Sequence, residues 1–381
     1  MKIAKELNNF IRFKELDQTK KEIIFYSEDE ESFYHFKGII NYLTVDFNKK
    51  ITYITSQSDD AIFAKDLANV DVFYFNKLLP NVIKNLKAKA LVMTMPDIDL
   101  FHIKRSKYGT NHIYIFHNIG SSFPVIRFGA LFNYDTLFCV GQHHKVEIKK
   151  QEDLYNLKTK TLVDFGYYKL ELIKKQYDAY NKKYDLKNNP IKNNILLAPT
   201  WGKNSILNFC GIRLINTLLG MGYNITVRPH PMTFKKSKNL INKLIKLYGG
   251  NENFILEENI SSTKSFYDAD IFITDWSGVA YEYAFGTERP ILFIDVPQKV
   301  INTKYKELGI EPIDINLRYN LGKVLKLEDI DRIDVYINDL ILNKDQYAKT
   351  IKKTRNEMIY NFGSSSKIGA DYIASLIEMK Q

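Results

Sequence analysis

The stretch that decides the fold is ADIFITDWSG at residues 269–278, followed directly by VAYEYAF at residues 279–285. It begins with a short, mostly apolar run of β-branched and aromatic side chains, as in a buried strand. A polar turn follows at residues 275–278, and the next seven residues are typical of a helix. A strand, a tight turn and a helix form the repeating unit of a parallel α/β sheet. We therefore expect one such unit here.

Further strand candidates lie on both sides of this stretch. They share short runs of β-branched and aromatic residues, and they lie at residues 23–26, 51–56, 70–75, 90–95, 112–117, 136–141, 194–198, 223–227, 254–257 and 290–295. The intervening chain is long enough for helices, and helical periodicity is present at residues 81–88 and 205–219. The pattern predicts an α/β protein with two doubly wound, Rossmann-like domains that face a central cleft.

The chain changes character between the two series of strands. Lys and Tyr dominate there, residues 170–180 keep a helical pattern, and Asn188-Asn189-Pro190 ends any helix. We predict a first domain at residues 1–165, a basic connection at residues 166–192 and a second domain at residues 193–360.

Composition narrows the class of protein. The 381 residues are 45% hydrophobic and 26% charged, which excludes a disordered chain. Two cysteines, Cys139 and Cys210, are too few for a disulfide scaffold and indicate a reducing compartment. The sequence has neither the apolar core of a signal peptide nor a run long enough to span a membrane. The net charge of +10 favours polyanionic partners, so we expect a cytoplasmic protein that acts on phosphorylated substrates, nucleic acid or a membrane surface.

Polar residues follow four of the strands at their carboxyl ends, where ligands bind in doubly wound sheets. In the first half, the strand candidate at residues 112–117 ends in His117. In the second half, the residues at strand ends are Thr200, Trp201, Arg228, His230, Thr274, Asp275, Ser277 and Gly278. Because these ends meet at one cleft, we predict a binding site there.

Two of these turns have features of an anion site. Arg228-Pro229-His230-Pro231 places a cation and an imidazole on a backbone stiffened by two prolines, which suits a preorganised phosphate contact. An ordinary helix cap by His230 is the alternative.

The turn at Ser277 and Gly278 would offer the free N–H groups of the following helix to a phosphate, and glycine permits close approach. An ordinary N-cap by Ser277 is the alternative. Glu282, one turn into the helix, is placed to accept hydrogen bonds from ribose hydroxyls or is simply a solvated charge.

His117 is the clear titratable group of the first half's cleft loop and a candidate general base. His143 and His144 form a pair without further ligand-like neighbours, so we expect no metal site. The chain also lacks the glycine-rich fingerprints of P-loop NTPases and of nicotinamide enzymes, which weighs against both classes.

The motifs resemble those of the CDP-glycerol glycerophosphotransferase family of teichoic acid and capsule polymer synthesis. The resemblance rests on segments that together cover most of residues 190–381: ILLAPTW at 195–201, RPHP at 228–231, ADIFITDWSG at 269–278, YEYA at 281–284, RPILF at 289–293 and the closing helix expected within residues 361–381.

The resemblance implies a GT-B architecture, no cofactor and no catalytic metal. It implies a transferase that moves glycerol phosphate from CDP-glycerol to a hydroxyl of a cell-surface polymer or its lipid-linked primer and releases CMP. His117 would be the base, and His230 and Arg228 would stabilise the leaving CMP. The remaining substrate-binding candidates are Thr200, Trp201, Thr274, Asp275, Ser277, Gly278 and Glu282.

The first half departs from the family pattern. Where the family has His-Gly-Thr-Pro, this chain has His117-Asn118-Ile119-Gly120, and the family's Gly-Tyr-Pro-Arg appears as GYYK at residues 166–169. Gly278 replaces a serine of the family's turn. These departures leave the acceptor and the donor open.

Alternatives remain at this stage. A GT-B glycosyltransferase of capsule or lipopolysaccharide synthesis with a CMP- or UDP-sugar donor would use the same pyrophosphate turn, and a UDP-sugar 2-epimerase is related. A nucleic-acid-binding protein fits the charge, but no basic stripe with interleaved aromatics is present. The net charge and an amphipathic N-terminal segment, with Ile3, Leu7 and Ile11 among lysines, predict attachment to an anionic membrane surface on the inner face of the cell membrane.

Overall fold

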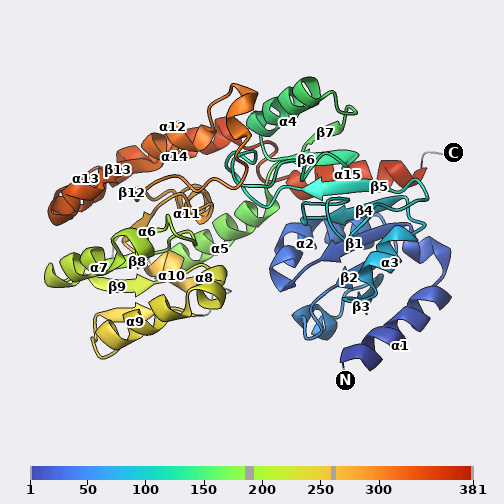
Figure 1. Cartoon of the computed structure of the whole chain (residues 1–381), viewed down its shortest axis with the longest axis horizontal. Coiled ribbons are helices and arrows are strands. Elements are labelled where there is room, and N and C mark those ends of the chain that lie inside the picture. Colours follow the sequence, from blue (N-terminus) through green and yellow to red (C-terminus); the bar gives the residue numbers. More distant parts are fainter. Residues whose placement is uncertain (1, 185–192, 259–262, 379–381) are drawn as a thin grey trace.

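The computed structural model describes residues 2–184, 193–258 and 263–378, and its two parallel sheets lie side by side in the long direction of the molecule (Figure 1). The first sheet has the strand order β3-β2-β1-β4-β5-β6-β7. Its strands are β1 (Ile23–Ser27), β2 (Ile51–Thr55), β3 (Val70–Tyr74), β4 (Ala90–Met93), β5 (Asn111–Ile115), β6 (Thr136–Cys139) and β7 (Thr161–Asp164).

The second sheet has the order β10-β9-β8-β11-β12-β13 and is also parallel throughout. Its strands are β8 (Asn194–Leu197), β9 (Asn224–Val227), β10 (Phe254–Leu256), β11 (Ile271–Thr274), β12 (Ile291–Asp295) and β13 (Gly322–Lys326). In each sheet the order reverses once, between β1 and β4 and between β8 and β11. The predicted pair of doubly wound domains is therefore confirmed, and ligand crevices belong at these two reversals.

Helices cover both sheets, as the strand sequences require. The residues of β1, β2 and β4 are buried without interruption, which is the pattern of strands covered on both faces. The helices are α1 (Lys2–Glu15), α2 (Phe33–Asn41), α3 (Leu79–Lys84), α4 (Gln142–Tyr155), α5 (Tyr168–Tyr184), α6 (Ile206–Phe209), α7 (Gly211–Gly220), α8 (Pro231–Lys236), α9 (Lys238–Tyr248), α10 (Lys264–Asp268), α11 (Val279–Thr287), α12 (Ile313–Leu321), α13 (Ile333–Leu342), α14 (Lys344–Met358) and α15 (Ser365–Glu378).

Two helices join the halves. α5 packs against α2 of the first half and α11 of the second, and α15 returns from the second half to pack on α2 (Figure 1). Ala370 and Ile373 of α15 are buried in the core of the first half. The helices expected near residues 170–180 and at the C-terminus are thus confirmed.

Three details differ from the sequence-based expectation. The helix predicted at residues 205–219 is divided at Cys210 into α6 and α7. β7 and β13 were not predicted, because both lack a continuous apolar run: β7 is only partly covered, and β13 reads GKVLK.

Among the described residues, no helix is both long enough and apolar enough to cross a membrane.

Candidate active site

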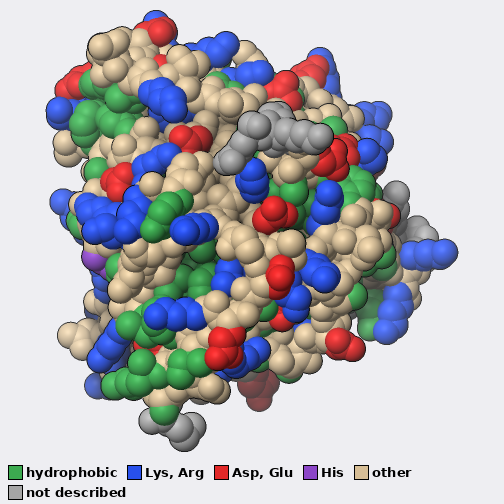
Figure 2. Space-filling view, turned by 90° about the vertical axis from the view of Figure 1, so that its right-hand side faces the viewer, with side chains coloured by type: hydrophobic (Ala, Val, Ile, Leu, Met, Phe, Trp, Pro, Cys, Tyr) green, Lys and Arg blue, Asp and Glu red, His purple; other side chains and the backbone are tan. Residues whose placement is uncertain are grey.

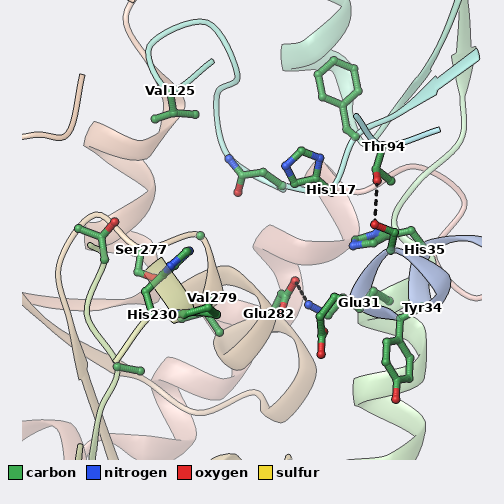
Figure 3. A pocket seen from close by; sticks show the side chains of 18 of the residues that line it. Glu31, Tyr34, His35, Thr94, His117, Val125, His230, Ser277, Val279 and Glu282 are labelled. Atoms are coloured by element: carbon green, nitrogen blue, oxygen red, sulfur yellow. Dashed lines mark hydrogen bonds and ion pairs between the residues drawn. The ribbon is translucent and has the colours of Figure 1, made fainter. Parts of the chain in front are cut away.

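A cavity of about 670 Å³ lies between the carboxyl ends of the two sheets and is lined by residues of both halves. Figure 3 shows His117 on one side and His230 and Ser277 facing it, with Glu282 between them. The predicted site residues that line this cavity are His117, Thr200, Arg228, His230, Ser277, Gly278 and Glu282. Trp201, Thr274 and Asp275 lie behind its wall rather than in its lining.

His117 follows β5, and its ring is open to the cavity while protein surrounds it on the other sides. Its Nδ1 lies 3.2 Å from the Tyr114 hydroxyl, and its carbonyl accepts a hydrogen bond from Tyr167 at 3.0 Å. Burial, and then the positive charge of Lys169, lower the pKa of His117 below its ordinary value. The ring is therefore neutral near pH 7 and able to accept a proton.

Two histidines that were considered as a metal pair instead hold the His117 loop. The Nε2 atoms of His143 and His144 donate to the carbonyl oxygens of Ile119 and Gly120 at 2.9 and 3.0 Å. A carbonyl can only accept, so these nitrogens carry protons. Across residues 2–184, 193–258 and 263–378, no group of three or more His, Cys, Asp or Glu residues is placed to bind a metal ion.

His230 both caps a helix and faces the cavity. Its Nδ1 accepts a hydrogen bond from the Met232 N–H at 3.0 Å, at the start of α8. Burial, and then the charge of Lys299, lower the pKa of His230 to about 4. The ring is therefore neutral near pH 7, and because Nδ1 accepts, the proton must be on Nε2. His230 offers the cavity a neutral N–H donor rather than a positive charge.

Arg228 supplies a cation to the same wall. Its guanidinium donates to the Ser265 hydroxyl at 3.1 Å and lies 3.6 Å from Glu257. Burial lowers the pKa of Arg228, but an arginine remains protonated in proteins. The side chain is thus held in place by the second half and presents its charge at the cavity lining.

Lys299 is a second cation of this wall that the sequence analysis missed. Its Nζ lies 4.2 Å from the centre of the Trp201 ring, and burial lowers its pKa to about 8. Nζ of Lys236 lies 5.1 Å from the centre of the same ring, so Trp201 contacts two lysines, of which Lys299 lines the cavity. The available signal was the position of Lys299 a few residues beyond the carboxyl end of β12.

The turn before α11 is open to the cavity. The N-cap residue of α11 is Gly278 and not Ser277, whose backbone carbonyl accepts from the Ala280 N–H at 3.1 Å. A Cβ on Gly278 would lie 2.6 Å from Oδ1 of Asn118, a residue of the opposite half. A larger residue would therefore displace the Asn118 side chain, whereas glycine leaves room for close approach by the other half and by a ligand.

Thr274 and Asp275 form the floor beneath this turn. The Thr274 hydroxyl donates to the Ala198 carbonyl at 2.7 Å, which joins the ends of β11 and β8. Asp275 accepts from the backbone N–H groups of Thr200 and Ile206 at 2.8 and 3.0 Å, and burial raises its pKa to about 6. These two residues position the lining and do not form it.

Glu282 is held from the other half of the molecule. Its Oε1 lies 2.8 Å from the Tyr167 hydroxyl and 3.1 Å from Nζ of Lys169. The same hydroxyl lies 3.0 Å from the His117 carbonyl, so its single proton is shared between the two acceptors. The carboxylate is therefore connected to the backbone of the candidate base through one tyrosine.

The first half contributes carboxylates that the sequence analysis did not single out. Glu28, Asp29 and Glu31 line the cavity just beyond the end of β1. Burial, and then the charge of Asp29, raise the pKa of Glu28. The strand-end rule that found His117 applies equally to β1 and would have found these residues.

Comparisons with known proteins agree with this architecture. Residues 9–306 match the model of the CDP-glycerol:poly(glycerophosphate) glycerophosphotransferase family. The chain is similar to the wall teichoic acid polymerase TagF, with a TM-score of 0.61 and 16% identity over 100% of this chain and 98% of that chain. No match is found among curated proteins.

Two further solved structures are similar. A putative UDP-N-acetylglucosamine 2-epimerase from Listeria monocytogenes gives a TM-score of 0.59 and 14% identity over 94% of this chain and 98% of that chain. WaaG, a glycosyltransferase involved in lipopolysaccharide biosynthesis, gives 0.51 and 14% over 92% and 99%. At these identities the likeness establishes the fold, which is the two-domain GT-B architecture.

Proposed function

The chain belongs to the CDP-glycerol:poly(glycerophosphate) glycerophosphotransferase family and is a glycerophosphotransferase-like enzyme. From this premise we propose that it transfers glycerol phosphate from CDP-glycerol to a hydroxyl of a cell-surface polymer or its lipid-linked primer. The observation that carries the proposal is one cavity with the imidazole of His117 on one wall and a cation, an N–H donor and a helix N-terminus on the other.

In the proposed reaction, the acceptor hydroxyl gives its proton to His117, and its oxygen attacks the phosphorus nearest glycerol. The bond between that phosphorus and the oxygen of CMP breaks, and CMP leaves with the electron pair. Arg228, the Nε2–H of His230 and the N–H groups at the start of α11 are placed to stabilise the developing negative charge. Positioning and charge stabilisation supply most of the rate in phosphoryl transfer.

The two halves would divide the substrates between them. We propose that residues 193–360 bind the donor, with Glu282 on the ribose, and that residues 1–165 bind the acceptor. Thr274, Asp275 and Trp201 would act indirectly, because they support the lining from behind. The proposal uses no metal and no cofactor, since all charge stabilisation is assigned to side chains and backbone of the chain itself.

We further propose that the enzyme works on the cytoplasmic face of the cell membrane, attached to the anionic lipid surface. Ile3, Leu7 and Ile11 form a stripe along α1 and are 59%, 51% and 56% exposed. Lysines 2 and 5 lie on the same helix, and Figure 2 shows Lys and Arg side chains spread over this side of the molecule among small hydrophobic patches. Such a helix can lie on an anionic bilayer, where a lipid-linked acceptor would be found.

The test compares donors on the purified protein. CDP-glycerol and a panel of CMP- and UDP-sugars are supplied with a polyol or sugar acceptor, and nucleotide release is measured with and without EDTA. The proposal is supported if CDP-glycerol releases CMP, no sugar nucleotide is turned over, and EDTA leaves the release unchanged. Turnover of a sugar nucleotide instead favours the glycosyltransferase or epimerase alternatives, and loss of activity in EDTA that magnesium restores contradicts the metal-free mechanism.

A further inference from the structure

The loop that carries the candidate base is anchored to the opposite half of the molecule. Three residues after Asn118, the Ser121 N–H donates to Oδ2 of Asp314 at 2.9 Å. The Ser121 hydroxyl in turn accepts from the Ile313 N–H at 2.9 Å. Asp314 and Ile313 form the start of α12 in the second half, whereas the loop follows β5 of the first. The loop therefore donates one hydrogen bond to the start of α12 and accepts one from it.

Asp314 also connects this loop to the donor helix. Its Oδ1 accepts a hydrogen bond from the Tyr281 hydroxyl at 2.5 Å, and Tyr281 precedes Glu282 on α11. A Cβ on Gly120 would lie 2.3 Å from Oδ1 of Asp314 and 2.8 Å from the Tyr281 ring. The loop can therefore approach this pair only because residue 120 has no side chain.

Within its own half, the same loop is held by α4. The Ser122 N–H and hydroxyl donate to Glu147 at 3.0 and 2.8 Å. Further along, Asn302 of the second half donates to the Phe123 carbonyl at 3.0 Å. The segment nearest His117 is thus clamped between α4 on one side and Asp314 on the other.

We propose that Asp314 is a positioning residue for the transfer reaction, holding the His117 loop against α11 so that base and donor site are aligned only when the two halves are together. Asp314 does not line the cavity, so it acts through the loop and not on the substrate. Two donors, from Ser121 and Tyr281, converge on its carboxylate, and its removal leaves both without an acceptor. The inference rests on the proposed role of His117 as base.

The experiment compares Asp314→Ala, Asp314→Asn and Gly120→Ala. We expect Asp314→Ala to lower kcat by up to about 100-fold, because a shift of about 1 Å in a catalytic group can cost that much. CMP binding, measured by calorimetry, should stay within about twofold of wild type if the donor wall is intact. Asn retains an oxygen for Ser121 and an amide that can donate to the Tyr281 oxygen, so Asp314→Asn should recover most of kcat.

Gly120→Ala tests the same loop from its other side and should lower kcat with unchanged CMP affinity. Glu307→Ala is the matched control: Glu307 accepts from Tyr155 at 2.9 Å, which is another carboxylate contact between the halves, but neither residue lines the cavity. This control should keep wild-type kcat.

The proposal is overturned if Asp314→Ala keeps kcat within about twofold, or if kcat, CMP affinity and melting temperature fall together in both Asp314→Ala and Gly120→Ala. If Asp314→Ala does not fold, Gly120→Ala decides, and full kcat there overturns the proposal. The assay uses whichever nucleotide donor the wild-type protein turns over, and the calorimetry then uses the nucleotide released from that donor in place of CMP. Failure of CDP-glycerol as donor would therefore contradict the proposed function and leave the positioning test intact.

Discussion

The two walls of the cavity carry opposite charge. The wall of the second half has the cations Arg228 and Lys299 and the N–H donor of His230 against one carboxylate, Glu282, whereas the wall of the first half has Glu28, Asp29 and Glu31. Cations and N–H donors suit the phosphates of a nucleotide donor, whereas carboxylates suit the hydroxyls of a polyol or sugar. The comparison supports the proposal that the donor binds to the second half and the acceptor to the first.

The walls also differ in how they are held. Arg228, His230 and Asp275 are bound by neighbours from their own half. The His117 loop, in contrast, is bound by both halves. The contacts proposed for the donor phosphates can therefore form within the second half, although Glu282 is held by Tyr167 and Lys169. The proposed base is placed only when the halves meet. Binding and chemistry should therefore separate in mutants.

The largest separation is expected for His117→Ala. Loss of the base should lower kcat by about 10²- to 10⁴-fold, while CMP affinity stays unchanged because the donor wall is untouched. CMP release and calorimetry measure the two quantities, and circular dichroism checks the fold. Near wild-type turnover would show that His117 is not the base.

Substitution of His230 should weaken donor binding as well as lower the rate, unlike the loss of the base. We expect His230→Ala and His230→Asn each to lower kcat by about 100-fold or more, since a charge-stabilising donor is lost. Asn can still cap α8 through its side-chain oxygen, so His230→Asn removes the Nε2–H contact and keeps the cap. Full activity in His230→Asn would mean that the residue matters only as a cap.

The acidic wall offers a smaller, acceptor-specific effect. Asp29→Asn keeps the acceptor oxygen that caps the turn at Ser32, but it removes the negative charge. We expect the KM for acceptor to rise by about tenfold, as for loss of a charged hydrogen bond, with the KM for donor unchanged. A change confined to the donor would reverse the assignment of the two walls.

The pH dependence should follow the lowered pKa values of both cleft histidines. Because burial holds His117 and His230 neutral to a pH below their ordinary value of 6.5, kcat/KM should stay level down to about that pH and fall only below it. The unfolded chain takes up protons at these sites near pH 6.5, so the free energy of unfolding should also decrease as the pH falls below this value. An acid limb above pH 7 would contradict a base that is neutral at that pH.

The smallest effect on turnover is expected at α1, because none of its residues lines the cavity between the two halves. Replacing Ile3, Leu7 and Ile11 by Ser should reduce sedimentation with anionic vesicles and leave turnover of a water-soluble acceptor unchanged. High salt should also release the protein, since the Debye length falls to about 3 Å at 1 M. No sedimentation of the wild-type protein at low salt would exclude this mode of attachment.

The sequence by itself determined the parallel strands, the two-domain architecture and seven of the residues that line the cavity. Strand sequences are local, and the carboxyl-end rule converts their positions into a site, which is how His117, Arg228, His230 and the turn at Ser277 were found. Glu28 was missed because the rule was not applied to the end of β1. β13 was missed because the strand has too few apolar residues to be recognised from the sequence.

Only the tertiary structure decided which way polar residues at the strand ends point and what holds them. Asp275 faces inward because two backbone N–H groups converge on it, and the proton of His230 is on Nε2 because Nδ1 caps α8. Asp314 meets Ser121 although they lie 193 residues apart in sequence. Local sequence preferences cannot predict a contact between residues so far apart in the chain, because the contact exists only after the two sheets have packed together.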